Sequence, residues 1–431
     1  MRLSQYLSLA LVALAAGSEP VLAQPPDTVT CPESIAAVAT CYTAKLDTGA
    51  YLLAAVPKDW NGSLIVFAHG GPGPIPPSPT YSMGSLRRYG LEVKLGNAWI
   101  ASTYRNLGFG VQQSADDTDQ ARQYFIERFG KPKRTIIHGA SYGGLVGAML
   151  IERYGGNYDG AFFNSGMLAG AVAGYQFRAD LRAVYQYYCK NLPRPSEPQY
   201  PIWMGLPADS RMTLDELTAR IDECTGVTRP AATRTELQKK NLANILGVGG
   251  FHESVLIRHM QYGTFNFRDI ASITHGKSPF SNVNSIYRGS DDDEALNRGV
   301  IRFESDPAGI AALKADAEPK AALAIPVMAI HSINDPQVTV NAEAFYRDLA
   351  KSTGSADKLV QAYTDENGHT AQSDAEIAAA LDSLMQWIES NTRPSPQSVT
   401  VACGNFRATL AGPCRYQPEF EPKGYVTTGA R

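Results

Sequence analysis

The chain has little net charge, and long hydrophobic runs are almost absent from it. Its 39 lysine and arginine residues are balanced by 42 aspartate and glutamate residues, which leaves a formal net charge of −3. Because binding to a phosphate backbone needs an excess of positive charge, we expect no nucleic acid partner. The 44% of hydrophobic residues in the 431-residue chain are enough for a large core, which excludes disorder as its main state.

The one long apolar run, Leu7 to Ala16, is too short to span a membrane, which takes about 20 apolar residues. It follows a single cation, Arg2, and is followed by short side chains before a cut after Ala23. This pattern is typical of a secretory signal peptide over residues 1–23. We therefore predict a secreted or periplasmic protein whose mature chain begins near Gln24 and has no membrane span. An N-terminal membrane anchor is the alternative.

Cysteine is scarce, and its even count suits disulfide bonds rather than a reactive thiol. Export would place the six cysteines in an oxidising compartment, where pairing is expected. Spacing alone does not determine the connectivity. We expect near neighbours to pair, because each pair would then close one segment of the chain: Cys31 with Cys41, Cys189 with Cys224, and Cys403 with Cys414.

Metal-binding patterns are also absent. The chain has no His-Glu-x-x-His motif, and the histidines of the middle region, His252, His259 and His275, lack ligand spacing. The acidic run from Asp291 to Glu294 lacks the residue pattern of a calcium loop and is more typical of a solvated helix start. We therefore predict no metal and no cofactor.

What the sequence does contain is an alternation of short apolar strands and helices. Strands are predicted at 63–68, 98–104, 135–137, 161–164, 325–331 and 359–363, and helices at 114–129, 142–154, 340–350 and 373–390. A capping box of Ser114 and Asp117 marks the start of the first of these helices. The alternation predicts an α/β fold, with a mostly parallel sheet and helices on both faces.

This alternation stops in the middle of the chain, which is rich in aromatic residues, interrupted by prolines and mainly helical in pattern. An insertion into a single α/β core accounts for the change most simply. In chain order we therefore predict the first part of the core at 24–170, a large, mainly helical inserted cap at 171–320, the second part of the core at 321–391 and a C-terminal tail at 392–431.

A Gly-x-Ser-x-Gly motif stands where a predicted strand turns into a predicted helix. It reads Gly139-Ala140-Ser141-Tyr142-Gly143, and Gly144 follows it. In a nucleophile elbow the serine sits in a strained conformation at the tip of such a turn, and side chains at the glycine positions would collide across it. The free N–H groups of the helix N-terminus then face the reacting centre. This context favours Ser141 as a catalytic nucleophile over an ordinary glycine-rich turn.

A second glycine cluster, His69-Gly70-Gly71-Pro72-Gly73, follows the predicted strand at 63–68. Glycines let backbone N–H groups approach a substrate oxygen, which is what an oxyanion hole requires. We assign the oxyanion donors to the N–H groups of Gly71 and Tyr142, with another glycine of the cluster as the alternative to Gly71. Without the serine motif, the cluster would indicate a plain turn.

A serine hydroxyl needs a general base and an orienting acid to act as a nucleophile. His369 lies in a loop between the last predicted strand and the final helix, where the catalytic groups of parallel sheets collect. Asp335 follows the strand at 325–331 and is the predicted acid, with Asp365 as the alternative. His331, at the end of the same strand, is a candidate for a residue that contacts the catalytic residues without taking part in the reaction. The predicted catalytic residues are, in chain order, Ser141, Asp335 and His369.

Taken together, these motifs resemble those of the α/β-hydrolase superfamily, over about residues 55–170 and 320–391. The run His69-Gly70-Gly71-Pro72-Gly73 with the Ser141 motif is similar to proline iminopeptidase-like enzymes and to some secreted carboxylesterases. Thr103-Tyr104-Arg105-Asn106 also resembles the strand-end Tyr-Arg-Gly of prolyl-oligopeptidase-type peptidases, with asparagine in place of the glycine. The resemblance implies an α/β-hydrolase fold and a serine hydrolase that works through an acyl-enzyme.

The sequence leaves two bond types open, and we favour a carboxylic ester because esters need less activation of the leaving group than amides do. A serine exopeptidase is the alternative. It would need a cap carboxylate to hold a free amino terminus, and Glu216, Glu223 and Glu253 are available. A non-catalytic binding protein on the same fold is the third candidate, although no triad residue has been lost.

The expected partner is a small-molecule or short peptide substrate. We expect the aromatic residues of the cap to form its core, with the lining of an apolar acyl pocket as the alternative. These residues are Tyr175, Phe177, Tyr185, Tyr187, Tyr188 and Trp203.

Overall fold

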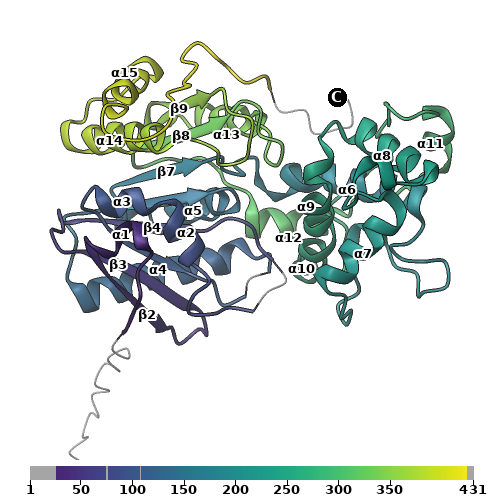
Figure 1. The fold of residues 1–431 in the computed structure, drawn as a ribbon, viewed down its shortest axis with the longest axis horizontal. Helices are drawn as coiled ribbons and strands as arrows, with labels where there is room; N and C mark the ends of the chain where they lie inside the picture. The colour runs from purple at the N-terminus through teal and green to yellow at the C-terminus, as the bar shows by residue number, and fades with distance from the viewer. Residues whose placement is uncertain (1–25, 74–75, 107, 425–431) are drawn as a thin grey trace, which may run out of the picture.

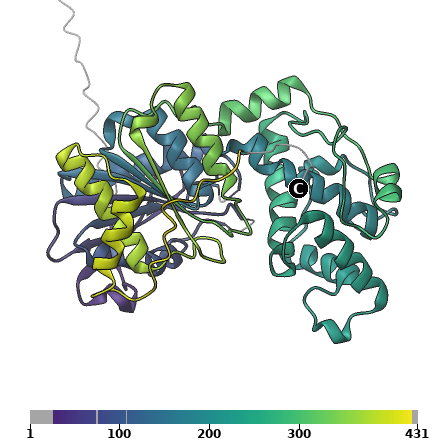
Figure 2. The same cartoon turned by 90° about the horizontal axis from the view of Figure 1, so that it is seen from above.

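The structure is a computed structural model that describes residues 26–73, 76–106 and 108–424. The predicted signal peptide at 1–23 lies outside these described residues. A sheet with helices on both faces forms one lobe, and a group of helices forms a second lobe beside it (Figure 1; Figure 2).

The described residues form a nine-stranded sheet with the order β1-β2-β3-β5-β4-β6-β7-β8-β9. Antiparallel pairing joins its first three strands, which are β1 (Asp27–Val29), β2 (Ala39–Lys45) and β3 (Tyr51–Pro57). The remaining strands run parallel to one another: β4 (Ser63–Ala68), β5 (Ala98–Ser102), β6 (Arg134–Ala140), β7 (Gly160–Asn164), β8 (Val327–Ser332) and β9 (Leu359–Thr364). Because β4 lies between β5 and β6, the strand order reverses there, at the kind of crevice where open α/β sheets bind ligands.

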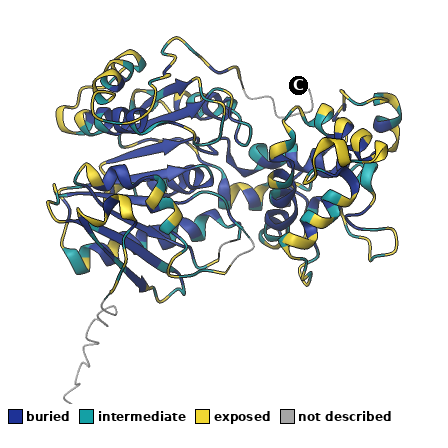
Figure 3. Ribbon diagram, in the orientation of Figure 1, coloured by how far each residue is buried: buried dark blue, intermediate teal, exposed yellow. Residues whose placement is uncertain are grey.

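Helices cover both faces of the sheet, which explains why its central strands read as unbroken apolar runs. Along β4, Leu64 and Val66 pack into the core on one face, whereas Ile65 and Phe67 pack into the core on the other. The central strands of the sheet are dark blue, the colour of buried residues, in Figure 3. The first core contains α4 (Val111–Phe129), α5 (Tyr142–Tyr154) and α13 (Asn341–Ser352). The second contains α1 (Glu33–Ala36), α2 (Met83–Arg88), α3 (Gly90–Lys94), α14 (Asp374–Ser390) and α15 (Pro396–Phe406). This arrangement confirms the predicted α/β-hydrolase fold.

One predicted helix start is wrong. Helix α4 begins at Val111, with Gly110 before its first residue, so Ser114 lies inside the helix. The Ser114 hydroxyl donates to the carbonyl oxygen of Gly110 at 2.7 Å. The carboxylate of Asp117 accepts two hydrogen bonds from the Arg105 guanidinium, at 2.9 and 2.5 Å. A charge-assisted pair is stronger than a neutral cap, and it draws Asp117 away from the predicted capping box.

Between β7 and β8 the described chain is mainly helical. Its helices are α6 (Gly170–Cys189), α7 (Leu214–Thr225), α8 (Glu236–Gly249), α9 (Leu256–Gln261), the π-helical turn η5 (Tyr262–Asn266), α10 (Phe267–Ile273), α11 (Asp293–Gly299) and α12 (Pro307–Ala317). Helix α6 places Leu181, Val184 and Tyr185 in a hydrophobic cluster with residues of α7, α8 and α9. This cluster is separate from the two cores of the sheet, so part of the inserted region has a core of its own. Residues of α10 and α12 instead belong to the first core of the sheet.

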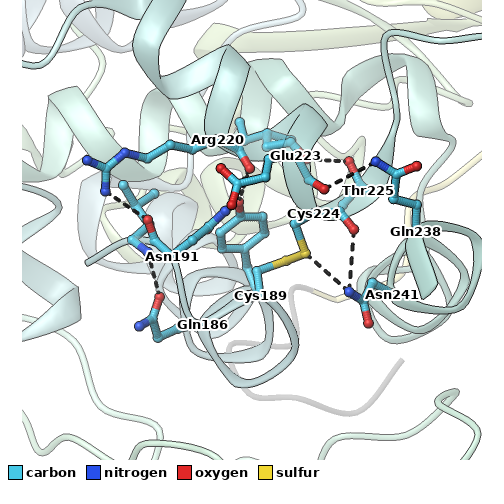
Figure 4. The surroundings of a disulfide bond; sticks show 12 residues. Gln186, Cys189, Asn191, Arg220, Glu223, Cys224, Thr225, Gln238 and Asn241 are labelled. Carbon is cyan, nitrogen blue, oxygen red and sulfur yellow. Dashed lines mark hydrogen bonds between the residues drawn. A yellow bond between two sulfur atoms is a disulfide. The ribbon is translucent and has the colours of Figure 1, made fainter. Parts of the chain in front are cut away.

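Three disulfides join the cysteine pairs that lie nearest in sequence: Cys31–Cys41, Cys189–Cys224 and Cys403–Cys414. The second links the end of α6 to the end of α7 (Figure 4). Beside it, the side-chain amide of Asn191 donates to the carbonyl oxygen of Arg220 at 2.8 Å, and that of Asn241 donates to the carbonyl oxygen of Cys224 at 3.4 Å. The disulfide therefore lies where three cap helices meet.

The C-terminal tail returns to the sheet. Its helix α15 packs against α14, and the backbone N–H of Gln417 donates to the carbonyl oxygen of Tyr363 at 2.8 Å. One step further, the N–H of Asp365 donates to the carbonyl oxygen of Arg415 at 2.9 Å. The tail thus fixes the segment that leads from β9 to His369.

Candidate active site

Ser141 lies at the sharp turn between β6 and α5. Its φ is 59° and its ψ is −121°, a conformation that residues other than glycine rarely adopt. The flanking glycines make the turn sterically feasible. A Cβ at Gly143 would overlap the carbonyl oxygen of Ala68, and a Cβ at Gly139 would overlap the carbonyl oxygen of Gly143. The backbone therefore holds the serine at the carboxyl end of a parallel strand.

The structure brings Ser141, His369 and Asp335 together. The Nε2 atom of His369 lies 2.7 Å from the Oγ of Ser141, and its Nδ1 atom lies 2.7 Å from the Oδ2 of Asp335. With Nδ1 donating to the carboxylate, Nε2 is left to accept the serine hydroxyl. The Oδ1 atom of Asp335 accepts the backbone N–H groups of Gln337 and Val338 at 2.8 and 3.0 Å. The carboxylate that orients the imidazole is thus itself held by the backbone.

The two candidate acids differ in their surroundings. Asp365 is exposed, and its Oδ1 atom accepts a hydrogen bond from the side-chain amide of Asn334 at 3.3 Å. The side chain of Asp335 is fully buried. Among the described residues, Asp335 is the candidate acid that contacts His369.

Electrostatics favour an ionised Asp335. Burial on its own would raise the pKa of this carboxyl, but hydrogen bonds and charges from His331 and His369 outweigh that effect and hold its pKa well below the ordinary value. Burial also lowers the pKa of His69, at the start of the glycine cluster, to about 4. Its ring nitrogens lie 2.9 Å from the carbonyl oxygen of Gly70 and 3.3 Å from that of Thr103, and the neutral ring donates to only one of them. His69 is therefore neutral at physiological pH and serves as packing beside the glycine cluster.

Contacts from distant parts of the chain hold the loop that carries His369. The next residue, Thr370, has a φ of 51°, and its N–H donates to the Oγ of Ser165 at 3.3 Å. From α2, the Nη2 atom of Arg88 donates to the carbonyl oxygens of Thr370 and Gln372 at 3.2 and 2.6 Å. Neither Arg88 nor Ser165 lies in a recognisable motif, so sequence reasoning missed both.

The glycine cluster after β4 passes beside Ser141. A Cβ at Gly70 would lie 3.0 Å from the Cβ of Ser141 and 3.6 Å from its Oγ. Gly71 has a φ of +53°, which glycine adopts without strain. The N–H of Tyr142 belongs to the first turn of α5 and has no intrahelical partner. Gly71 and Tyr142 therefore remain the candidates for oxyanion donors.

A tyrosine of the cap faces the same glycines. Tyr262 begins the π-helical turn η5, and its hydroxyl would lie 3.0 Å from a Cβ at Gly71. The guanidinium of Arg178 lies 5.3 Å from the centre of the Tyr262 ring. Turns of this type are frequent at functional sites. No sequence pattern marks them, so sequence reasoning did not find Tyr262.

A cavity of about 510 Å³ lies between the inserted helices and the sheet, next to Asp335. Met167 and Asp335 line it, and the backbone N–H of Met167 donates to the carbonyl oxygen of Ser141 at 3.0 Å. Neither Ser141 nor His369 is in the lining, so the cavity is a side chamber on the Asp335 side of the site. Its walls combine apolar and charged side chains. The apolar ones include Ala173, Phe177, Leu181, Val184, Ile333 and Val338, and the charged ones besides Asp335 are Arg178, Asp180, Arg288 and Lys423.

The aromatic residues that the sequence singled out in the cap fall into two groups. Phe177 lines the cavity. The others pack in hydrophobic clusters, fully or partly buried: Tyr175, Tyr185, Tyr187, Tyr188 and Trp203. Most of these aromatic residues therefore pack in hydrophobic clusters, as expected for core residues, whereas Phe177 lies in the wall of a pocket.

The three cap glutamates considered for binding an amino terminus have other partners. Glu216 forms a capping box with Thr213 at the start of α7. Glu223 forms an ion pair with Arg194, and Glu253 forms one with Arg234. None of the three lines the cavity.

Within residues 26–73, 76–106 and 108–424, no group of three or more histidine, cysteine, aspartate or glutamate side chains is arranged to bind a metal ion. The helices of these same ranges include none that combines the length and the apolar character needed to cross a membrane.

Comparisons with known proteins give distant structural similarity. No protein-family model matches the chain, and no curated protein matches it. Candida antarctica lipase A in its closed state is similar at 13% identity over 91% of this chain and 94% of that chain, with a TM-score of 0.45. Feruloyl esterase B from Aspergillus oryzae is similar at 12% identity over 89% of this chain and 90% of that chain, with a TM-score of 0.42.

A peptidase is also among the similar structures. Acylaminoacyl peptidase from Pyrococcus horikoshii is similar at 10% identity over 93% of this chain and 44% of that chain, with a TM-score of 0.36. Scores of this size carry no weight for the reaction, which has to be argued from the residues of this chain. Those residues define an α/β-hydrolase fold that carries a serine–histidine–aspartate arrangement.

Proposed function

We propose that the protein is a secreted serine hydrolase that cleaves carboxylic esters through an acyl-enzyme on Ser141. The observation that carries the proposal is the pair of 2.7 Å contacts that connect Asp335 through His369 to the Oγ of Ser141. These contacts supply a base for the serine and an acid that orients the base, at a turn where the hydroxyl is accessible.

Acylation begins when the Oγ of Ser141 attacks the carbonyl carbon of the ester and the Nε2 of His369 takes the hydroxyl proton. The carbonyl oxygen becomes an oxyanion, to which the N–H groups of Tyr142 and Gly71 donate. Loss of one such donor typically costs about 2.7–4 kcal/mol of transition-state stabilisation. His369 then passes its proton to the leaving alcohol as the ester carbon–oxygen bond breaks, and the acyl group stays on Ser141.

Deacylation repeats these steps with water. A water molecule attacks the acyl carbon while His369 takes one of its protons, and the same N–H groups stabilise the second oxyanion. The bond to Ser141 breaks, its Oγ regains a proton from His369, and the carboxylic acid leaves. Asp335 stays ionised throughout and balances the imidazolium that forms in each half of the cycle.

A serine exopeptidase remains the alternative, and the charges in the cavity argue against it. Besides Asp335, the described carboxylate in the lining is Asp180. Its Oδ1 accepts the hydroxyls of Ser285 and Tyr287 at 3.0 and 2.8 Å, and burial raises its pKa. A carboxyl with these partners is a poor anchor for an ammonium group. Three cations, Arg178, Arg288 and Lys423, also line the cavity and would repel an ammonium group. The apolar part of the walls favours an ester with an apolar acyl or alcohol part.

Secretion is supported by the three disulfides, because such bonds form and persist in oxidising compartments. The apolar run at Leu7 to Ala16 supports it independently. We expect the exported protein to begin near Gln24 when its N-terminus is sequenced. An intact Met1 on protein recovered from the exported fraction would contradict the cleavage site.

The reaction is tested by comparing two families of substrate. We expect the purified protein to hydrolyse p-nitrophenyl esters faster than aminoacyl or prolyl p-nitroanilides. Ser141→Ala should lower ester turnover by a factor on the order of 10⁴ or more, because the residues of a triad act as a unit. The control is Ser254→Ala, which removes an exposed hydroxyl from the short 3-10 helix Glu253–Val255 and should leave turnover unchanged.

Two results would overturn parts of this proposal. Strong anilide turnover with weak ester turnover would establish the exopeptidase instead. Ester turnover by Ser141→Ala at the rate of the unmodified protein would reject Ser141 as the nucleophile. A melting temperature within a few degrees of the original shows that Ser141→Ala is folded.

A further inference from the structure

His331, near the end of β8, is a fully buried histidine between two carboxylates. Its Nδ1 atom lies 3.0 Å from the Oε1 of Glu343, which comes from α13. Its Nε2 atom lies 2.9 Å from the carbonyl oxygen of Val338 and 3.5 Å from the Oδ2 of Asp335. The Oδ2 of Asp335 is the same atom that accepts the Nδ1–H of His369. The two imidazole rings therefore share one carboxylate oxygen.

These partners determine where the protons of His331 lie. A carbonyl oxygen can only accept a hydrogen bond, so the Nε2 atom facing Val338 must carry a proton. The Nδ1 atom faces a carboxylate whose second oxygen, Oε2, accepts a hydrogen bond from the side-chain amide of Gln361 at 2.6 Å. A second proton is therefore needed between Nδ1 and Glu343. The arrangement is that of an imidazolium paired with a carboxylate.

The positive charge of His331 reduces the net negative charge of the buried cluster. With His331 as a cation and Glu343 and Asp335 as anions, the buried cluster has a net charge of −1. When His369 becomes an imidazolium in the transition state, its positive charge brings the net charge of the cluster and His369 together to zero. Without the cation, the same pocket would hold two negative charges, and a buried excess of charge is costly.

We propose that His331 is a positioning residue that acts through Asp335: held as an imidazolium by Glu343, it keeps the buried cluster at one net negative charge and so sets the pH at which His369 can act as a base. The inference rests on the proposed serine hydrolase activity. It assigns a role to Glu343 as well, although neither Glu343 nor Gln361 lies in a sequence motif.

The electrostatics of the surroundings agree with this role. Burial alone would lower the pKa of His331, yet hydrogen bonds and charges from Asp335 and Glu343 raise it to about 10. The phenols of Tyr346 on α13 and Tyr363 on β9 also interact with Glu343. From the inserted helices, the Arg178 guanidinium and the His259 ring donate to the carbonyl oxygens of Gln337 and Pro336, beside Asp335, at 3.1 and 3.0 Å. Arg178 is a cation in every variant compared, so its charge contributes equally to all of them. Burial raises the pKa of both phenols far above the physiological range, so they stay neutral and leave the charge balance unchanged.

The first test is the pH profile of kcat/KM for an ester. Its acidic limb reports the loss of the neutral base in the free enzyme. His331→Gln removes the cation and leaves two anions, which favour the protonated form of His369. We expect the acidic limb to move to higher pH by about 0.5–1 unit, which is a three- to tenfold loss of kcat/KM below the limb. The plateau at high pH should fall far less, and KM there should stay within about twofold.

A second variant separates charge from packing. Adding Glu343→Gln to His331→Gln removes one anion and restores the net charge of −1. We expect the acidic limb of the double variant to return toward that of the unmodified protein. A residue that matters through packing alone would give the opposite pattern, in which the double variant is more damaged at every pH and the limb stays where it is.

The matched control is the other buried histidine–carboxylate pair, His138 and Glu92, whose Nδ1 and Oε1 atoms lie 2.5 Å apart. His138→Gln leaves the cluster around Asp335 intact. This variant should cost stability without moving the acidic limb. An equal displacement of the limb in His138→Gln and His331→Gln would overturn the proposal.

A measurement on the unmodified protein needs no variant and no activity. Nitrogen-15 NMR of the seven histidine rings distinguishes an imidazolium from a neutral ring. We expect one ring to keep both nitrogens protonated from pH 6 to pH 9. A spectrum in which every ring is neutral at pH 8 would overturn the inference. Absence of ester turnover with such a ring present would instead count against the proposed function alone.

Discussion

The Nε2 atom of His369 lies 2.7 Å from the Oγ of Ser141, although 228 positions separate the two residues in the chain. They meet because β6 and β9 run parallel and end at the same edge of the sheet. All the inserted helices lie between them in sequence, between β7 and β8. The site therefore forms only if the chain returns to the sheet at β8 after the inserted helices. The hydrophobic cluster of α6 to α9 lets these helices pack together between the two parts of the sheet.

The turn that presents Ser141 should tolerate no side chain at Gly143. A Cβ there would overlap the carbonyl oxygen of Ala68, which is backbone and is fixed within the sheet. We expect Gly143→Ala to lower the free energy of unfolding by about 3 kcal/mol, at the upper end of overpacking effects, and to abolish turnover. Urea unfolding monitored by circular dichroism measures the loss.

The control for this prediction is Gly155→Ala, at the other end of the same helix. Gly155 has a φ of −53°, and no atom lies within 4 Å of a Cβ placed there. We expect this variant to be as stable as the original protein or more stable by up to about 1 kcal/mol. Equal stability of the two glycine variants would contradict the close approach at Gly143.

The elements around the site follow a pattern that the sequence reveals. Buried parallel strands are continuous apolar runs, and the predicted strand at 63–68 has the bounds of β4. The predicted helix at 142–154 has the bounds of α5 because a glycine-rich turn marks its start. The antiparallel strands β1 to β3 and the helix α15 are not among the predicted elements, although β3 is a mostly buried apolar run that the same rule would have marked. They appear only in the structure.

The disulfide between Cys189 and Cys224 should stabilise the inserted helices. It closes a loop with a sequence separation of 35 and joins the ends of α6 and α7. Loop-closure entropy gives about 4 kcal/mol for a loop of this length. We expect the double variant Cys189→Ala/Cys224→Ala to lower the melting temperature and to release the inserted helices to limited proteolysis before the sheet.

A comparison with the N-terminal disulfide tests this argument. Cys31 and Cys41 close a loop with a sequence separation of only 10, for which the same entropy gives about 3 kcal/mol. Removing that pair should cost less and should leave the protease sensitivity of the inserted helices unchanged. Identical proteolysis patterns for the two double variants would contradict a local role for Cys189–Cys224.

The cavity beside Asp335 should set the preferred length of the ester. Gly174 lines it, and a Cβ there would make only an ordinary contact with Met167. If the cavity receives the acyl chain, kcat/KM should rise with chain length by up to about fourfold per methylene. Gly174→Phe should remove this gain for p-nitrophenyl octanoate and spare p-nitrophenyl acetate, whereas Gly174→Ala should keep it. A chain-length profile that Gly174→Phe leaves unchanged would place the substrate elsewhere.

Sequence order and strand ends suffice to propose Ser141, Asp335 and His369, because parallel strands bring their carboxyl ends to one edge. The residues that surround these three could not be predicted from the sequence. Arg88 and Tyr262 reach the site across long sequence distances, and Glu343 reaches it from α13, the helix that follows Asp335. None of the three stands in a motif. Their contacts depend on how α2, η5 and α13 pack, which no local pattern encodes.

The stability of the folded protein should fall between neutral and alkaline pH because of His331. Its pKa is raised from 6.5 to about 10 in the folded state, where burial opposes and the hydrogen bonds of Asp335 and Glu343 favour the proton. The folded chain therefore holds this proton more tightly than the unfolded chain does. Its contribution to stability is complete below about pH 6.5 and disappears as the pH rises through about 10, with a slope of at most about 1.4 kcal/mol per pH unit.

Urea unfolding of Ser141→Ala at pH 6, 7, 8, 9 and 10, with the disulfides intact, should show this decline in the free energy of unfolding. Adding His331→Gln to Ser141→Ala should make the dependence on pH weaker. Parallel profiles for the two proteins over the whole range would mean that His331 holds no extra proton in the folded state.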